Sequence, residues 1–170
     1  MKKIIWIIII GAVLWGGYYF LSSPASNPQI SKDQKVVVDP KIPKNYTDPD
    51  LGFGFSYPGD YTSSVINDGD IKTILIQKDG KGMQLYVAPY DGAVVSSLLI
   101  KREIKDVKVE NLKDIESPNG IKATTFYYND SSLGGVWNVW FSRDKKIFQL
   151  VAQADHEEAI KMFVETFVFE

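Results

Sequence analysis

An uninterrupted apolar run near the N-terminus constrains this chain more than any other feature of its sequence. The eighteen residues 4–21 contain no charged side chain, and they directly follow Lys2 and Lys3. At about 1.5 Å of rise per residue, an α-helix of this length covers roughly 27 Å, close to the thickness of the hydrocarbon core of a bilayer. The run therefore predicts a single transmembrane helix within residues 1–21.

The two lysines also orient this predicted helix. Positively charged flanks stay on the cytoplasmic side of a membrane, so Lys2 and Lys3 place the N-terminus in the cytoplasm. Residues 22–170 are then expected on the other side. The sequence accordingly predicts a single-pass plasma-membrane protein with an extracytoplasmic C-terminal domain.

The same run has a second interpretation, a cleaved signal peptide. Signal peptides have an apolar region of about 7 to 15 residues and a cleavage site between small residues, which residues 23–25 (Ser-Pro-Ala) offer. The run is longer than that, and it has aromatic residues of the kind that anchor spanning helices at the interface, namely Trp6, Trp15, Tyr18 and Tyr19. We therefore favour a retained anchor and leave cleavage after Ala25 open.

Prolines mark the segment that follows. Four of the eight prolines of the chain fall within residues 22–46, among Ser, Asn, Lys and Asp. This composition favours an extended, solvated backbone and predicts a flexible linker. The remaining 124 residues, 47–170, have a usual size for one domain. The predicted parts are thus an anchor, a linker and one extracytoplasmic domain.

Composition excludes several kinds of function. The chain has no cysteine, so it forms no disulfide, no thiolate metal site and no thiol nucleophile. Residues 1–46 carry a net charge of +4, whereas residues 47–170 carry −6. Binding to nucleic acid needs clustered Lys and Arg, so no nucleic-acid partner is expected for the acidic domain.

The domain is predicted to be mainly β. Seven segments rich in β-branched and aromatic residues are separated by Asp-Gly, Asn-Gly and Gly-Gly turn signals or by short charged connections. These predicted strands are Phe53–Tyr57, Ile71–Gln77, Met83–Tyr90, Val107–Ile115, Ile121–Tyr128, Val136–Ser142 and Ile147–Gln153. Closely spaced hairpin turns indicate antiparallel pairing, because parallel neighbours need longer crossovers.

Two segments have helical spacing instead. Asp155 followed by Glu158 has the spacing of a capping box, and an apolar stripe follows at Ala159, Met162, Phe163 and Thr166. Residues 167–169 then return as a strand, and residues 93–104 fit a second helix. The predicted fold class is α+β, an antiparallel sheet packed between helices and preceded by the N-terminal transmembrane helix.

Motifs at both ends of the domain resemble those of the PsbP-like superfamily. Tyr46-Thr47-Asp48 precedes Gly-Phe-Gly-Phe-Ser-Tyr-Pro at residues 52–58, and Glu-Glu-Ala at 157–159 leads to Phe-Val-Glu-Thr-Phe-Val-Phe at 163–169. The resemblance implies an antiparallel sheet between helices, an α/β/α sandwich. Because members are mostly non-catalytic, it also implies a binding or scaffolding module. Tyr61 stands where many members have a tryptophan.

Catalytic and metal-binding patterns are weak. We therefore expect that the protein is not an enzyme and that it has no cofactor and no metal site. His156 is the only histidine, and its predicted place at a helix start indicates a solvated residue. Ser142–Lys145 matches Ser-x-x-Lys, but it bridges two predicted strands instead of opening a buried helix. Asp48–Asp50 and Asn67–Asp70 are typical of turns, and neither completes a calcium loop, although calcium binding stays open.

Aromatic residues on the predicted strands are the remaining candidates for a binding surface. If a helix covers them they belong to the core; if one side is open they form a platform for a glycan or a protein partner. These candidate contact residues are Tyr86, Tyr90, Tyr127 and Trp140.

Three functions are compatible with these observations. We prefer a membrane-tethered extracytoplasmic binding or assembly domain with an envelope protein as its partner. The first alternative is an envelope glycan-binding module that uses an aromatic face. The second is an envelope hydrolase built on carboxylates, which would need a deep cleft containing an acid with a raised pKa.

Overall fold

The computed structural model describes residues 42–92, 94–104, 108–131 and 134–170. The predicted transmembrane segment and nearly all of the predicted linker lie outside these residues. Within the described part of the chain, no helix has both the length and the apolar character that crossing a membrane requires.

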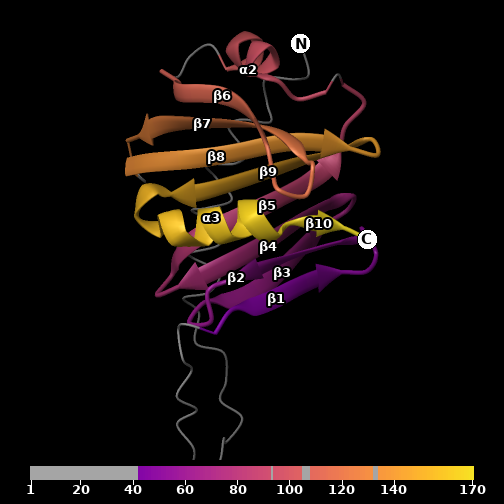
Figure 1. The fold of residues 1–170 in the computed structure, drawn as a ribbon, viewed down its shortest axis with the longest axis vertical. Coiled ribbons are helices and arrows are strands. Elements are labelled where there is room, and N and C mark those ends of the chain that lie inside the picture. The colour runs from indigo at the N-terminus through magenta and orange to yellow at the C-terminus, as the bar shows by residue number, and fades with distance from the viewer. Residues whose placement is uncertain (1–41, 93, 105–107, 132–133) are drawn as a thin grey trace, which may run out of the picture. The chain divides into compact units, whose positions relative to one another are not determined.

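A seven-stranded antiparallel sheet forms the centre of the domain (Figure 1). The strands lie in the order β3, β4, β5, β9, β8, β7 and β6. Their bounds are Thr62–Asp68 (β3), Ile71–Lys78 (β4), Lys81–Pro89 (β5), Glu110–Glu116 (β6), Lys122–Asp130 (β7), Gly134–Arg143 (β8) and Lys146–Gln153 (β9). All but one of the neighbouring pairs are consecutive hairpins; β5 pairs with β9 through the long return of the chain.

A second, smaller sheet lies beside the first. It contains β1 (Lys44–Asp48), β2 (Phe53–Tyr57) and β10 (Val168–Phe169), with β2 in the middle and all pairs antiparallel. The first and last strands of the domain therefore meet in one sheet. Because β2 pairs with both, the two motifs of the family resemblance are neighbours in space.

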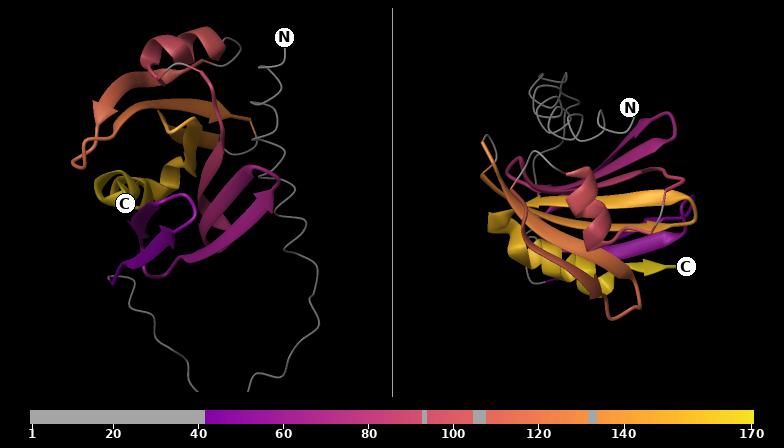
Figure 2. Two further views of the ribbon diagram at one scale, coloured as in Figure 1. Left: turned by 90° about the vertical axis from the view of Figure 1, so that its right-hand side faces the viewer. Right: turned by 90° about the horizontal axis from the view of Figure 1, so that it is seen from above.

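Helices cover the large sheet on both faces. Helix α3 (Glu157–Thr166), preceded by the 3-10 turn η1 (Ala154–His156), lies on the same face as the small sheet. The shorter α2 (Ser97–Glu103) packs on the other face, over β6 and β7. Figure 2 shows that the large sheet is curved, with α3 and the small sheet on its inner side.

The main core fills the space between the two sheets and α3, and it is dominated by phenylalanine. Phe167, which follows α3 directly, is almost fully buried, and its ring centroid lies 5.2 Å from that of Phe53 and 5.0 Å from that of Phe163. The side chain of Thr166 fastens the helix to β2, because its hydroxyl accepts a 2.8 Å hydrogen bond from Ser56 N. Packing and hydrogen bonding thus fix α3 on the sheet.

A smaller core lies under α2. Phe126 and Trp140 meet edge to face at 5.3 Å, and Ile100 of the helix is fully buried on them. Because alternate residues of a strand face opposite sides, the strands between two covered faces are apolar on both. This explains the two-sided apolar pattern of β8.

All seven predicted strands are present, and so is the predicted α+β class of antiparallel sheet with few helices. The structure corrects several details. There are two sheets instead of one, and two strands, β1 and β3, were not predicted. β1 begins at Lys44, inside the predicted linker, and β3 is too polar to show a strand pattern. Helix α2 begins at Ser97, four residues after the predicted start of that helix.

The predicted capping box at Asp155 is wrong. Asp155 lies within η1, and the N-cap of α3 is His156, whose side chain makes no capping hydrogen bond. The acidic residues Glu157 and Glu158 still occupy the first turn, where the helix dipole favours negative charge. The 3-10 turn moves the N-cap by one residue, from Asp155 to His156, and sequence spacing alone does not show that shift.

Candidate functional site: a groove beside helix α3

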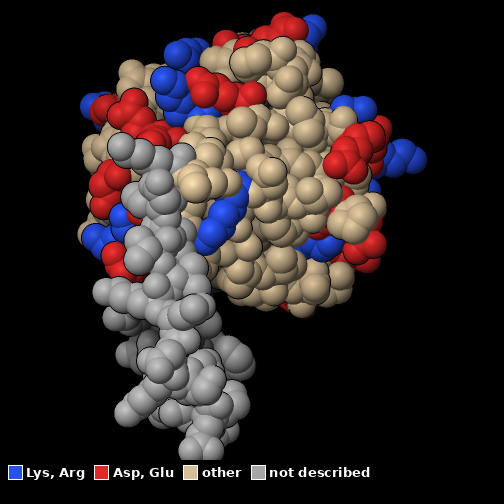
Figure 3. Space-filling view, turned by 60° about the horizontal axis from the view of Figure 1, so that its bottom comes forward, with Lys and Arg blue, Asp and Glu red and all other residues tan. Residues whose placement is uncertain are grey.

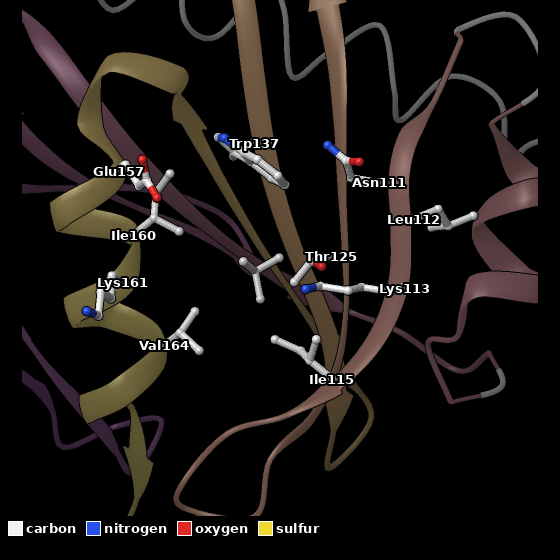
Figure 4. A pocket seen from close by; sticks show the side chains of 11 residues that line it. Asn111, Leu112, Lys113, Ile115, Thr125, Trp137, Glu157, Ile160, Lys161 and Val164 are labelled. Carbon is white, nitrogen blue, oxygen red and sulfur yellow. The ribbon is translucent and has the colours of Figure 1, made fainter.

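An open groove of about 560 Å³ runs between α3 and strands β6, β7 and β8 (Figure 4). Most of its lining residues come from the inner face of the curved sheet and from one side of the helix. They are Asn111, Leu112, Lys113, Ile115, Thr125, Trp137, Val139, Glu157, Ile160, Lys161 and Val164. The volume lies within the range of about 300 to 1,000 Å³ that is usual for ligand pockets.

The strand register assembles the floor of this groove. Lys113 of β6 lies opposite Thr125 of β7, and Thr125 lies opposite Val139 of β8. Paired residues of neighbouring strands point to the same face of a sheet, so these three side chains form a row. A bulge between Glu110 and Lys113 interrupts the outer strand at the same place. The floor therefore ends at an irregular edge.

Apolar side chains make up most of the walls. Ile160 and Val164 stand one helical turn apart on α3 and are only partly buried, so they leave an apolar stripe facing the sheet. A second hollow, of about 20 Å³, shares Ile115, Val139 and Val164 with the groove and continues toward the phenylalanine core. The groove is thus most apolar at this end.

The groove is lined by both donors and acceptors, because Asn111 and Glu157 accompany Lys113, Thr125 and Lys161. The Thr125 side chain is only 8% exposed, and its hydroxyl has no hydrogen-bond partner. Among the described residues no ion pair involves Lys113, and Figure 4 shows its side chain extending toward Thr125. Lys161 lies 3.9 Å from Glu165 on the exposed side of α3. An ammonium and a hydroxyl side by side favour a ligand that brings hydrogen-bond acceptors.

The four aromatic residues predicted as contacts do not form one surface. Tyr86 and Trp140 are buried on the face that α2 partly covers, whereas Tyr127 lies on the opposite face, 5.2 Å from Trp137 at the groove. Tyr90 follows β5, and its backbone N–H donates to Lys145 O. The role of these residues in binding stays a prediction, and the platform that would have joined all four is divided by the sheet.

The other candidate residues have local partners. His156 is not solvated as predicted: its Nδ1 lies 2.6 Å from the Tyr61 hydroxyl and its side chain is 11% exposed. Burial raises the pKa of Tyr61. The Ser-x-x-Lys segment is the hairpin turn between β8 and β9, with positive φ at Asp144 and Lys145. It therefore lacks the helical context that this chemistry needs.

The acidic pairs lie in or beside turns. The carboxylate of Asp48 is buried and bonded to Lys72, while Asp68 ends β3 and Asp70 lies in the turn between β3 and β4. In the part of the chain that the structure describes, no three acidic or histidine side chains gather as a metal site would require.

The groove itself was not predicted from the sequence. One signal was available: Lys113 and Thr125 place polar groups on a strand face that is otherwise apolar at Ile115 and Val139. That signal does not show whether a ligand can reach the strand face, because the same pattern also occurs on faces that a loop covers. In the structure the sheet curves around α3, and the helix leaves these residues uncovered.

Comparison with known proteins supports the fold. No family model matches the chain, and no curated protein matches it in sequence. Its structure is similar to the solution structure of cyanobacterial PsbP from Synechocystis sp. PCC 6803, with a TM-score of 0.51 and 12% identity. The similarity covers 83% of this chain and 99% of the other. At this identity the likeness concerns the fold alone.

Proposed function

We propose that this chain, which has a PsbP-like fold, is a membrane-tethered extracytoplasmic binding or assembly domain, and that the groove beside α3 holds its partner. The observation that carries this proposal is an apolar groove of about 560 Å³ with an unpartnered hydroxyl, that of Thr125, in its floor. An exposed apolar groove of this size favours a ligand that covers it, and the Thr125 hydroxyl lies buried at its floor without a hydrogen-bond partner.

The lining indicates the chemistry of the partner. Ile115, Ile160 and Val164 favour apolar side chains, and the donors of Lys113 and Thr125 favour a carboxylate between or beside them. An envelope protein with an exposed segment of apolar residues next to Asp or Glu fits both conditions. The predicted anchor would keep the groove close to such proteins at the membrane surface.

Site-specific photo-crosslinking in intact cells tests this proposal on the full chain. A photoreactive benzoylphenylalanine at Ile160, on the groove wall, should form covalent adducts with another protein. The same amino acid at Leu98 is a matched control, because this residue is 78% exposed on the opposite face of the sheet. Adducts from position 160 alone would support the proposal.

The groove chemistry supplies a second control. With the photoreactive residue at 160, Lys113→Glu should reduce the adduct, because a carboxylate in the groove would then face a like charge. Lys101→Glu, on α2 over the opposite face of the sheet, should have less effect. Equal adducts from positions 160 and 98, or none from 160, would overturn the groove as the binding site.

A further inference from the structure

The outer edge of β3 lacks the features that normally keep a sheet edge from pairing with another chain. Such features are short strands, prolines, lysines and bulges. β3 is seven residues long, contains none of these residue types, and pairs with β4 in unbroken register from Thr62 to Asp68. All seven residues are exposed.

The opposite edge of the same sheet is protected. β6 carries several charged residues, including Lys113 and Asp114, and a bulge interrupts its pairing with β7. Helix α2 also packs near it. Among the described residues, one edge therefore has the usual devices against association, and the edge at β3 has none of them.

The turn between β3 and β4 shows which backbone groups of β3 do not bond to β4. Gly69 and Asp70 form a two-residue turn with φ of +58° at Gly69, and the residues that close it are Asp68 and Ile71. In such hairpins the closing pair is hydrogen bonded, and bonded pairs then alternate along the ladder. The N–H and C=O groups of Ser63, Val65 and Asn67 must therefore point outward from the sheet.

Side chains along this edge also favour association. Val65 and Ile66 are 43% and 42% exposed, on opposite faces of the strand. Figure 3, a view from below, shows a broad area of uncharged residues crossed by a basic side chain, with both signs of charge around the margin. Apart from Asp68, β3 carries no charge that an added strand would desolvate.

We propose that β3 pairs with β3 of a second copy of this chain, antiparallel about a two-fold axis through Val65. In this register Val65 meets Val65 of the partner subunit, and Ser63 meets Asn67 of the partner subunit. The three outward-facing residues of each strand would then exchange roughly six backbone hydrogen bonds.

The strand is complementary to itself in this register. Asp68, its only charged residue, faces the hydroxyl of Thr62 of the partner subunit, so no like charges meet. Ile66 faces Ser64 of the partner subunit, and the paired Val65 side chains cover each other. A two-fold axis presents the same surface of both copies, as closed dimers require. The inference is independent of the groove, which lies at the other end of the sheet.

Disulfide crosslinking of the full chain in membranes tests the pairing. The chain has no cysteine, so each introduced one is unique. Val65→Cys should give a disulfide-linked dimer about tenfold more abundant than Leu98→Cys, because hydrogen-bonded antiparallel partners have Cα atoms within disulfide range. Ser63→Cys and Asn67→Cys should each crosslink poorly alone and efficiently when the two variants are coexpressed.

A second substitution separates loss of pairing from loss of folding. Asn67→Pro removes an outward N–H without removing a bond to β4, so Val65→Cys with Asn67→Pro should lose most of the dimer while keeping the protease resistance of the monomer. Equal crosslinking from positions 65 and 98 would overturn the proposal. Disulfides that link position 65 only to other proteins, and not to a second copy of this chain, would also overturn it.

Discussion

Asp48 on β1 and Lys72 on β4 form an ion pair that joins the two sheets, with 2.7 Å between Oδ2 and Nζ. The carboxylate is 2% exposed, and its second oxygen accepts a hydrogen bond from Leu51 N at 3.1 Å. The Tyr46 hydroxyl donates to Oδ2, the oxygen of the ion pair, at 3.2 Å. Burial, together with the charge of Asp48, raises the pKa of this phenol. The Tyr-x-Asp motif is therefore a structural junction.

Removing the buried carboxylate should destabilise the domain. We expect Asp48→Ala to lower the free energy of unfolding by about 3 kcal/mol, because it leaves Lys72 and the Leu51 N–H without their partner. Asp50 is the matched control, since it lies 3.8 Å from the same ammonium but is 87% exposed. Equilibrium unfolding of the full chain in urea would measure both variants. An equal loss for Asp50→Ala would contradict this account of Asp48.

The attachment of α2 should depend on pH. Asp114 accepts hydrogen bonds from the Ser97 backbone N–H and the Thr124 hydroxyl, both at 2.7 Å, and from the Ser97 hydroxyl at 2.8 Å. The bonds from Thr124 and Ser97 lower the pKa of this carboxyl below 3.8. A lowered pKa stabilises the folded state above the unfolded pKa, and this contribution is lost as the pH falls through the folded value.

Hydrogen exchange can test that dependence. Protection of the Ser97 amide should stay constant from neutral pH down to about pH 4 and fall below it. In Asp114→Asn the protection should be lower at neutral pH and should no longer fall with the same acid midpoint. A wild-type midpoint at or above the ordinary Asp pKa would contradict the proposed role of these bonds.

The phenylalanine that follows α3 should be critical for stability. Phe167→Ala should cost about 4 kcal/mol, the usual range for deleting a fully buried aromatic ring. The neighbouring Val168 is partly exposed, and Val168→Ala should cost less than about 1 kcal/mol. Denaturant midpoints of the two variants would show the difference, and similar midpoints would mean that α3 is not docked through Phe167.

Two tryptophans on β8 should differ in access to a quencher. Trp137 lies at the groove and is partly exposed, whereas Trp140 is buried against Phe126. Replacing Trp137 with Phe should remove more of the acrylamide-quenchable fluorescence than replacing Trp140 with Phe. The reverse order would show that Trp140 is accessible and would restore it as a contact residue.

The predicted orientation in the membrane can be tested with one cysteine. Leu98 is highly exposed, so Leu98→Cys should react in intact cells with a maleimide that does not cross membranes. Labelling only after lysis would place the domain in the cytoplasm and contradict the orientation expected from Lys2 and Lys3.

Strands with strong side-chain patterns were predictable, and weakly patterned ones were not. β4, β5, β8 and β9 contain β-branched and aromatic residues on both faces, so their composition indicates strands without any knowledge of their neighbours. The residues of β3 are mostly small and polar, and they form a strand only because β4 offers a ladder beside them. Pairing partners are not encoded locally, and an exposed edge strand has no core face to reveal it.

The sequence by itself determined the strand-rich α+β class, the final helix and the return strand, because periodicity and turn residues act over short distances. Only the tertiary structure decided that the chain forms two sheets, that Asp48 meets Lys72 across them, and that Lys113 and Thr125 line an open groove. These relationships depend on sheet curvature and on contacts between residues far apart in the chain. Such contacts result from packing the whole core and not from any local pattern.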